Sequence, residues 1–270
     1  RYVERWPYRW LLPLVYRHTR VMLLSWHLYP DISRVVKRDQ VVVCANGIPP
    51  LNVERLTFNV QRGTMNNGRG MENEDIVCNS LNVNRSSLIV KILFLSNLIP
   101  SRGVYVLLDA CRVLKERGLA FVCDFVGGET KEIDRATFEA AVRERGLEGV
   151  VCYHGPKYGE EKELYWQRAD VFVQPTYEDC FPLTIVEAMQ HGKPVVSTDE
   201  GAVPDLVEDG VNGFVCPRQD AHALAEALER LITDPALRQQ MGERGYQRYC
   251  EEYTLEAFEK RFAAELRVEE

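Results

Sequence analysis

The sequence lacks several features that mark common classes of protein. Its 270 residues contain no apolar run close to the roughly 20 residues that a membrane span needs. The eight cysteines stand singly, without Cys-x-x-Cys or paired Cys/His spacing, which argues against a zinc site and a disulfide framework. The net charge of -7 provides no electrostatic footprint for nucleic acid. We therefore expect a cytoplasmic protein with reduced thiols and no nucleic-acid partner.

Other absences concern cofactors and chain organisation. There is no Asp-x-Asp motif, so we expect a site that works without a metal ion or another cofactor. There is also no internal repeat. The chain starts at Arg1 without an initiating Met and without a signal segment, which suggests a truncated chain.

What the sequence does contain is a regular alternation of apolar strands and amphipathic helices from residue 88 onward. With 46% hydrophobic and 27% charged residues, the composition is that of a globular protein. The expected strands are 88–95, 121–126, 150–154, 169–174, 194–197 and 213–215, and the expected helices are 104–117, 138–145, 160–168, 182–191, 203–208, 221–233, 235–249 and 255–265. This alternation predicts an α/β fold with a doubly wound, parallel, Rossmann-like sheet.

One strand–loop–helix–strand unit, residues 171–198, combines acidic side chains with a helix start. Pro182 can open the helix, and Gly192 ends it. Asp179 lies before the helix and Glu187 one turn into it. In a parallel sheet, ligands bind at the carboxyl ends of strands beside helix N-termini, so free amides at the helix start are expected to face an anion.

The same unit resembles the donor-binding signature of retaining, nucleotide-sugar-dependent glycosyltransferases with the two-Rossmann GT-B architecture, particularly glycosyltransferase family four. That signature is an acidic residue, seven further residues and a Glu. Glu187 matches it, and Asp179 stands where the family usually has Glu. Ala188-Met, His191-Gly-Lys-Pro-Val-Val and Gly201-Ala-Val-Pro-Asp-Leu-Val also resemble the family. The resemblance extends over about residues 91–253.

The resemblance implies a donor domain with only part of a second domain. Ala45-Asn-Gly-Ile-Pro49 resembles the Pro-Asn-Gly-Ile-Asp motif that closes the family's N-terminal domain. The implied division is a remnant of the acceptor-binding domain (1–48), a partly disordered linker (49–87), the nucleotide-sugar domain (88–250) and a C-terminal helix crossing back to the N-terminal domain (251–270).

The resemblance also implies roles for three catalytic residues. Arg102 would neutralise the donor diphosphate and stabilise it as it leaves. Glu187 would accept hydrogen bonds from the ribose, and Asp179 from hydroxyls of the donor sugar. Glu178 is an adjacent rival to Asp179. Asn97 stands where many relatives carry a second Arg, and it can donate a hydrogen bond but brings no charge.

The remaining donor-binding positions lie in loops after the strands and at the helix start. The full expected set is Asn97, Gly127, Gly128, His154, Gly155, Cys180, Phe181, Pro182, Leu183 and Thr184. The Thr184 hydroxyl either binds the diphosphate or bonds only its own helix backbone. No second metal ligand is expected near His154, and Cys180 has no evident partner for a nucleophilic role.

Residues 1–29 are rich in Trp, Tyr and Arg. They indicate either a membrane-surface or lipid-acceptor patch, or a helix packed in a domain of which only part is present. Short strands are expected within residues 21–25 and 41–44.

These patterns together favour a hexosyltransferase. It would move a sugar from a UDP- or GDP-sugar to a glycan or lipid-linked acceptor, with retention of configuration, in cell-surface polysaccharide assembly. It would be cytoplasmic or peripheral to the inner face of the membrane. The alternatives are a nucleotide-sugar-binding module that lacks transferase activity because the N-terminal domain is incomplete, and another GT-B enzyme such as an epimerase or a phosphorylase. The phosphorylase's pyridoxal-binding Lys motif is absent.

Overall fold

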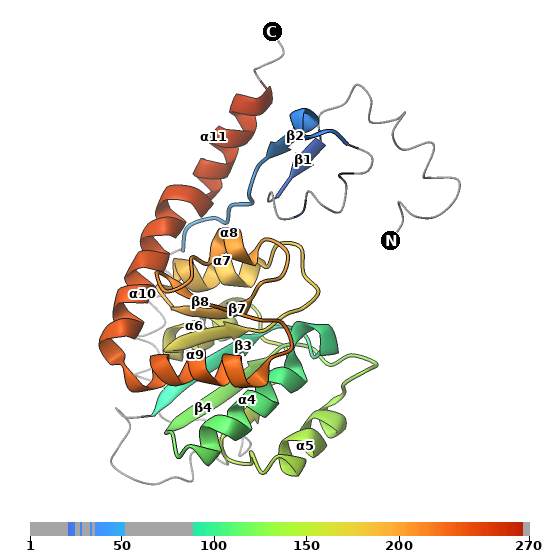
Figure 1. Cartoon of the computed structure of the whole chain (residues 1–270), viewed down its shortest axis with the longest axis vertical. Helices are drawn as coiled ribbons and strands as arrows, with labels where there is room; N and C mark the ends of the chain where they lie inside the picture. Colours follow the sequence, from blue (N-terminus) through green and yellow to red (C-terminus); the bar gives the residue numbers. More distant parts are fainter. Residues whose placement is uncertain (1–20, 25–27, 29–32, 34–35, 52–88, 267–270) are drawn as a thin grey trace.

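A six-stranded parallel sheet forms the centre of the protein (Figure 1). The computed structural model describes residues 21–24, 28, 33, 36–51 and 89–266, so residues 1–20 and most of the expected linker lie outside the described part. The strands are β3 (Val90–Leu95), β4 (Phe121–Val126), β5 (Val151–Tyr153), β6 (Val171–Gln174), β7 (Val195–Thr198) and β8 (Gly213–Cys216). Their order, β5-β4-β3-β6-β7-β8, is that of a doubly wound Rossmann sheet, which confirms the expected fold class.

The connections between the strands are helices, as the alternating pattern predicts. They are α4 (Val104–Glu116), α5 (Arg135–Glu144), α6 (Gly159–Arg168), α7 (Leu183–Gln190) and α8 (Val203–Leu206). Three further helices follow β8: α9 (Ala221–Thr233), α10 (Pro235–Arg248) and α11 (Leu255–Leu266). Three short turns were not expected: the 3-10 turns η3 (Arg38–Gln40) and η5 (Pro100–Arg102), and the π-helical turn η6 (Tyr249–Tyr253).

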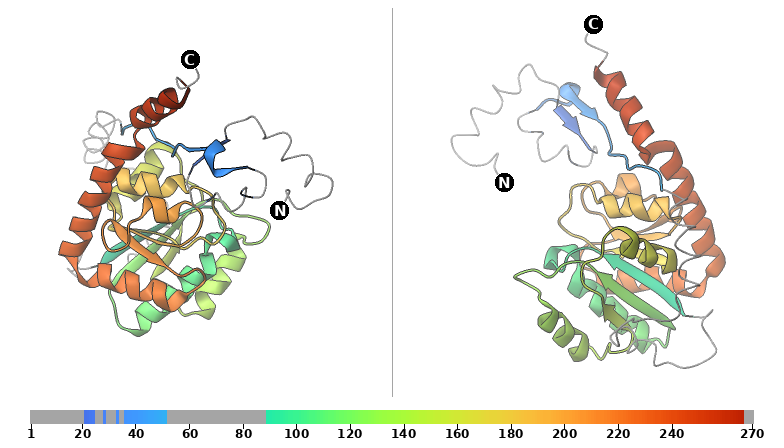
Figure 2. Two further views of the ribbon diagram at one scale, coloured as in Figure 1. Left: turned by 45° about the horizontal axis from the view of Figure 1, so that its top comes forward. Right: turned by 180° about the vertical axis from the view of Figure 1, so that it is seen from behind.

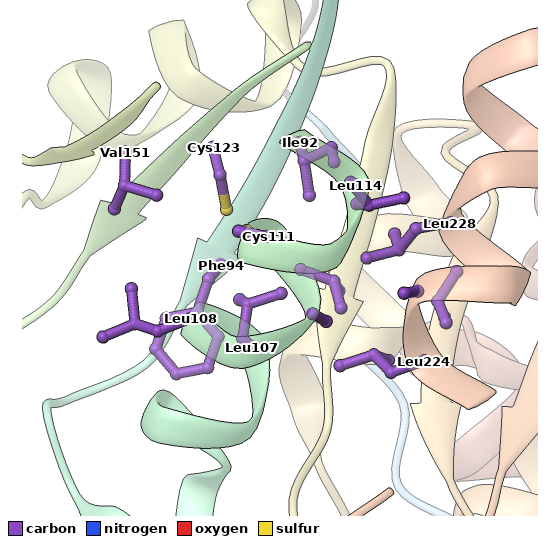
Figure 3. Packing of buried hydrophobic residues seen from close by; sticks show 14 of the residues in the cluster. Ile92, Phe94, Leu107, Leu108, Cys111, Leu114, Cys123, Val151, Leu224 and Leu228 are labelled. Atoms are coloured by element: carbon purple, nitrogen blue, oxygen red, sulfur yellow. The ribbon is translucent and has the colours of Figure 1, made fainter. Parts of the chain in front are cut away.

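Strand β3 shows why the sheet needs helices on both faces. Ile92 and Phe94 point to the face covered by α4 and α9, where they pack with Leu107 and Leu228 (Figure 3). Leu93 points to the opposite face and belongs to a second apolar cluster. Both sets are almost completely buried, which explains the apolar run from Ile92 to Leu95 in this strand.

The second cluster joins α6 and α7 to the other face of the sheet. Trp166 of α6 lies 5.1 Å from the Phe172 ring of β6, measured between ring centroids. Ile185 and Met189 of α7 are also fully buried there. This packing fixes where α7 begins relative to the ends of the strands.

The helix starts differ in how their backbone amides are satisfied. Asp134, Asp220 and Asp234 each accept hydrogen bonds from the first turn of α5, α9 and α10, respectively. Helix α7 begins after Pro182, and no side chain caps it. Its first amides therefore face the carboxyl edge of the sheet without a side-chain acceptor.

The described N-terminal residues form a separate two-stranded parallel sheet, β1 (Val21–Leu23) and β2 (Val41–Val43). The chain after β2 runs to the start of α11, where the Ile48 amide donates to the Tyr253 carbonyl at 2.9 Å and Leu255 donates back to Ile48 at 3.0 Å. Arg261 of α11 donates to the Ala45 carbonyl at 3.1 Å. Helix α11 thus extends beside the N-terminal strands (Figure 2).

Within the described residues, none of the helices is both long and apolar enough to cross a bilayer.

The cysteines only partly match the expectation of reduced thiols. Six described cysteines are free. Burial raises the pKa of Cys123 well above its ordinary value and raises the pKa of Cys216 to about 12, so these two are unreactive packing residues. Cys152 is bonded in a disulfide, so the expectation is wrong at that position.

Gly103 lies at the junction of η5 and α4, where the loop after β3 packs against the end of β6. A substitution at Gly103 therefore measures how tight this packing is. A Cβ atom at Gly103 would lie 2.0 Å from the Pro175 carbonyl oxygen, and φ is +83°. Gly118 has a similar φ of +74° with nothing within 4 Å of its Cβ position. We expect Gly118→Ala to cost about 1 kcal/mol from backbone strain alone.

Gly103→Ala should cost at least about 2 kcal/mol more, because the β3 loop or Pro175 must move. Urea unfolding of the two variants and the parent measures both values. Equal losses would mean that this contact is not tight.

Candidate functional site

Two hollows lie at the carboxyl edge of the sheet, near the position where strand order reverses between β3 and β6. The Arg102 hollow has a volume of about 550 Å³ and is lined by Leu28, Arg102, Glu178, Asp179, Cys180, Asp199, Glu200, Gly201 and Arg218. The Glu187 hollow has a volume of about 220 Å³ and is lined by Leu95, Ser96, Asn97, Val126, Gly127, Gly128, Pro156, Lys157, Tyr158, Lys162, Thr184 and Glu187. In open parallel sheets, ligands bind at such a switch point.

An ion pair between Arg102 and Asp179 forms the floor of the first hollow. Arg102 comes from η5 after β3, and Asp179 from the loop after β6. The two side chains are 27% and 13% exposed. Burial lowers the pKa of Arg102, while Glu178 and Cys180 nearby act in the opposite direction. The structure therefore brings together two of the three expected catalytic residues.

Gln174 connects this ion pair to the start of α7. It ends β6 and is only 3% exposed. Its side-chain amide nitrogen lies 3.5 Å from the Asp179 carboxylate, and its carbonyl oxygen accepts a hydrogen bond from the Thr184 hydroxyl. The idea that Thr184 bonds only its own helix is thus wrong. Gln174 was not predicted as a site residue. The feature that could have indicated it is a polar residue at the end of an otherwise apolar strand.

Glu187 lies in the second hollow and is held by Lys162 of α6. The Lys162 ammonium contacts both carboxylate oxygens, at 2.9 Å and 3.0 Å. The side chains are 29% and 24% exposed, so the pair is half-buried. Lys162 was not singled out in the sequence. Asp179 and Glu187 therefore line different hollows, on either side of the network through Gln174 and Thr184.

Asn97, Gly127 and Gly128 form the wall of the Glu187 hollow opposite α7. The Gly128 amide donates to the Asn97 side-chain oxygen at 2.9 Å. A Cβ atom at Gly127 would lie 2.0 Å from the Ser96 carbonyl oxygen, which explains the need for glycine there. Asn97 thus joins the loops after β3 and β4, and its oxygen is already occupied.

His154 and Gly155 follow β5 but line neither hollow. The Gly155 carbonyl accepts from the Gly127 amide at 3.0 Å, so it supports the glycine wall from behind. The Nε2 atom of His154 lies 2.7 Å from the Asp124 carboxylate. Asp124, Cys152 and His154 present ligand atoms within 4.8 Å of one another, so the expectation of no neighbouring ligand is wrong. The disulfide at Cys152 removes its thiolate from such a set.

Of the four expected donor-binding residues from Cys180 to Leu183, only Cys180 lines a hollow. Cys180 lines the Arg102 hollow with an exposed, free thiol. Phe181 is 8% exposed and belongs to the apolar cluster under α7, so it supports the loop rather than lining a hollow. Pro182 is the residue before the helix, and Leu183 is 44% exposed. Neither lines the two hollows, although the Leu183 amide belongs to the uncapped first turn.

The Arg102 hollow is dominated by carboxylates. Two arginines face four acidic side chains among its lining residues. Arg218, after β8, pairs with Asp199 at 3.2 Å and with Glu200 at 2.6 Å, and these partners raise its pKa. Gly201 packs closely over the Asp179 backbone, since a Cβ atom there would lie 2.1 Å from the Asp179 carbonyl oxygen. The sequence analysis did not single out Arg218, Asp199 or Glu200.

Structures of similar fold have been solved. The Anabaena protein HepE in complex with UDP superposes with a TM-score of 0.76 at 19% identity, over 96% of this chain and 67% of that chain. HepE in complex with UDP-glucose gives a TM-score of 0.72 at 20% identity, with the same coverage. Sucrose-phosphate synthase from Thermosynechococcus elongatus gives 0.70 at 23% identity, over 92% of this chain and 57% of that chain. These likenesses place the chain in the GT-B fold.

Curated proteins match by sequence. Amylovoran biosynthesis glycosyltransferase AmsK from Erwinia amylovora is 34% identical over 148 residues, which is 53% of this chain and 36% of that protein. D-inositol 3-phosphate glycosyltransferase from Corynebacterium diphtheriae is 30% identical over 209 residues, 76% of this chain and 45% of that protein. The chain thus spans less than half the length of these relatives.

The family model described as glycosyl transferases group 1 matches residues 89–248, which contain the six-stranded sheet and both hollows except Leu28. The chain therefore belongs to the glycosyl transferases group 1 family.

Proposed function

We propose that this chain binds a nucleotide-diphosphate sugar at the start of α7 and serves as the donor domain of a retaining glycosyltransferase. The observation that carries the proposal is the uncapped helix start between the two hollows, with Arg102 and Asp179 on one side and Glu187 on the other. A helix N-terminus supplies free amides and partial positive charge for the diphosphate.

In this proposal each hollow holds one end of the donor. The nucleoside enters the Glu187 hollow, where adjacent ribose hydroxyls donate to the Glu187 carboxylate. The sugar lies in the larger Arg102 hollow, where Asp179 accepts from its hydroxyls. The network through Gln174 and Thr184 links the two ends. UDP is the first candidate nucleotide, because a solved structure of similar fold contains it.

The transfer step breaks the bond between the anomeric carbon and the β-phosphate oxygen and forms a bond from that carbon to an acceptor hydroxyl oxygen. The hydroxyl proton passes to the leaving diphosphate. Arg102 and the α7 amides stabilise the negative charge that develops on this leaving group. The acceptor hydroxyl attacks from the face that the diphosphate leaves, which retains the anomeric configuration.

The proposed acceptor is a glycan or a lipid-linked sugar in cell-surface polysaccharide assembly, at the inner face of the membrane. The name of the Erwinia relative supports the polysaccharide context. Leu28 contributes to the Arg102 hollow from the N-terminal part of the chain, which supports an acceptor approach from that side. Donor binding without any transfer would instead identify the chain as a nucleotide-sugar-binding module.

The first test measures binding of UDP, GDP and ADP by calorimetry. We expect UDP to bind more tightly than GDP and ADP. We expect Glu187→Gln to lower the affinity for UDP by about 10- to 100-fold, because hydrogen bonds to a charged acceptor contribute about 1.5–3 kcal/mol. Glu178→Gln is the matched control and should leave UDP affinity within about twofold. If Glu178→Gln were the damaging change, the assigned register of the acidic residues would be wrong.

The second test concerns the donor sugar. A uronate would place another negative charge in a hollow where carboxylates outnumber arginines. We expect a UDP-hexose to bind about 10-fold more tightly than the matching UDP-uronate, since a repulsion of about 1.4 kcal/mol is ordinary at a half-exposed site. Glu178→Gln should narrow this ratio, and added salt should narrow it further. Equal affinities at low salt would contradict the assignment of the sugar to this hollow.

The third test concerns the metal. We propose that Arg102 and the α7 amides take the place of a divalent cation. UDP affinity should therefore be the same in excess EDTA and in millimolar Mg²⁺. A gain of 10-fold or more on adding Mg²⁺ would show that a cation completes the site.

A further inference from the structure

We infer that Lys162 is a donor-binding residue that supplies positive charge to the diphosphate. In the absence of nucleotide Lys162 pairs with Glu187, and it moves to the phosphates when the nucleotide binds. The inference rests on the proposed function, because it assigns a new residue and a new exchange step to the same site. Lys162 is the fourth residue of α6, an element that the sequence signature of the site does not include.

The starting observation is the two-oxygen contact between Lys162 and Glu187. At 2.9 Å and 3.0 Å, the ammonium donates to both oxygens that a ribose would use. The pair is half-buried inside the hollow itself, rather than on a solvated helix face. A ribose that binds Glu187 must therefore displace at least one Lys162 hydrogen bond.

The charges of the surrounding residues show why the displaced Lys162 ammonium is needed to neutralise the diphosphate. A nucleoside diphosphate brings two to three negative charges to the site. Arg102 is already paired with Asp179, in a hollow where carboxylates outnumber arginines. Asn97 is neutral, and its side-chain oxygen accepts from Gly128. Among the described residues lining the Glu187 hollow, only Lys157 and Lys162 carry positive charge.

Lys162 lies within reach of the α7 start. Glu187 is three residues beyond Thr184 on the same helix, which corresponds to a rise of about 4.5 Å. The four-carbon stem of lysine allows its ammonium to move such a distance by rotamer changes. After the move, the ribose hydroxyls satisfy Glu187, and the phosphates and helix amides surround Lys162. Neither buried charge is left unpaired at either end of the exchange.

A simpler role for Lys162 would be to orient Glu187 for the ribose. The two roles differ in the ligands they affect. A residue that only orients Glu187 contributes equally to binding of uridine and UDP, because both contain the ribose. A residue that moves to the phosphates contributes to UDP and not to uridine.

The experiment compares the affinities of uridine, UMP and UDP for the parent chain and for Lys162→Met, which keeps the stem and removes the charge. We expect UDP affinity to fall by about 10- to 100-fold, the range for hydrogen bonds to charged groups, while uridine changes by less than about threefold. Lys162→Arg should retain at least a tenth of the parent's UDP affinity. Lys131→Met, at an exposed lysine outside both hollows, is the matched control.

The outcomes separate the inference from the proposed function. If the parent binds none of the three ligands, the proposed function fails. If the parent binds UDP and Lys162→Met binds it equally well, or if uridine and UDP lose affinity equally, the role of Lys162 is overturned. A UDP-selective loss in Lys157→Met but not in Lys162→Met would also overturn it. Thermal melting of each variant shows whether it is folded.

A second variant tests the charge argument by restoring the charge elsewhere. Asn97 lines the same hollow as Lys162, so Asn97→Lys in the Lys162→Met background places a new ammonium beside the same phosphates. We expect this double variant to bind UDP at least threefold more tightly than Lys162→Met does, with no increase in the affinity for uridine. No recovery in a folded double variant would mean that the position of Lys162, and not its charge at the phosphates, is what matters, and this would overturn the inference.

Discussion

Three close backbone contacts among four loops at the carboxyl edge of the sheet are the constraint on which the site depends. Gly103 lies against the Pro175 carbonyl, Gly127 against the Ser96 carbonyl and Gly201 against the Asp179 carbonyl, and no side chain fits at any of these contacts. They bring the loops after β3, β4, β6 and β7 together around the start of α7. Functional side chains from distant parts of the sequence can then share one site without flexible connections.

Three cations of the site, Arg102, Lys162 and Arg218, are held in ion pairs with carboxylates of the site. Arg102 pairs with Asp179, Lys162 with Glu187, and Arg218 with Asp199 and Glu200. The polar network of Gln174 and Thr184 connects Asp179 to the first turn of α7, the helix that carries Glu187. Half-buried charges without partners are costly, so this pairing stabilises the surroundings of the site and holds these side chains in place.

The sequence was sufficient for the fold and for much of the wall of the site, but not for its network. Apolar runs such as that of β3 and glycines such as Gly192 report on local geometry, so strands, helices and loops could be predicted from them. Gln174 and Lys162 belong to ordinary strand and helix positions, and their importance arises only when α6, β6 and α7 meet. The same reason explains why the metal-ligand neighbours of His154 were not predicted. The Asp124 carboxylate that His154 contacts is thirty residues earlier in the sequence, on β4.

The proposed exchange at Lys162 also bears on release of the nucleotide. In a site with unpaired cations, a diphosphate would gain the full interaction with each cation and would leave slowly. Under the proposal, part of that gain is offset by the loss of the Lys162–Glu187 contacts, which form again when the nucleotide leaves. The affinity would then be the difference between two sets of ion pairs, so stabilisation of the leaving diphosphate during transfer would be compatible with departure of the product.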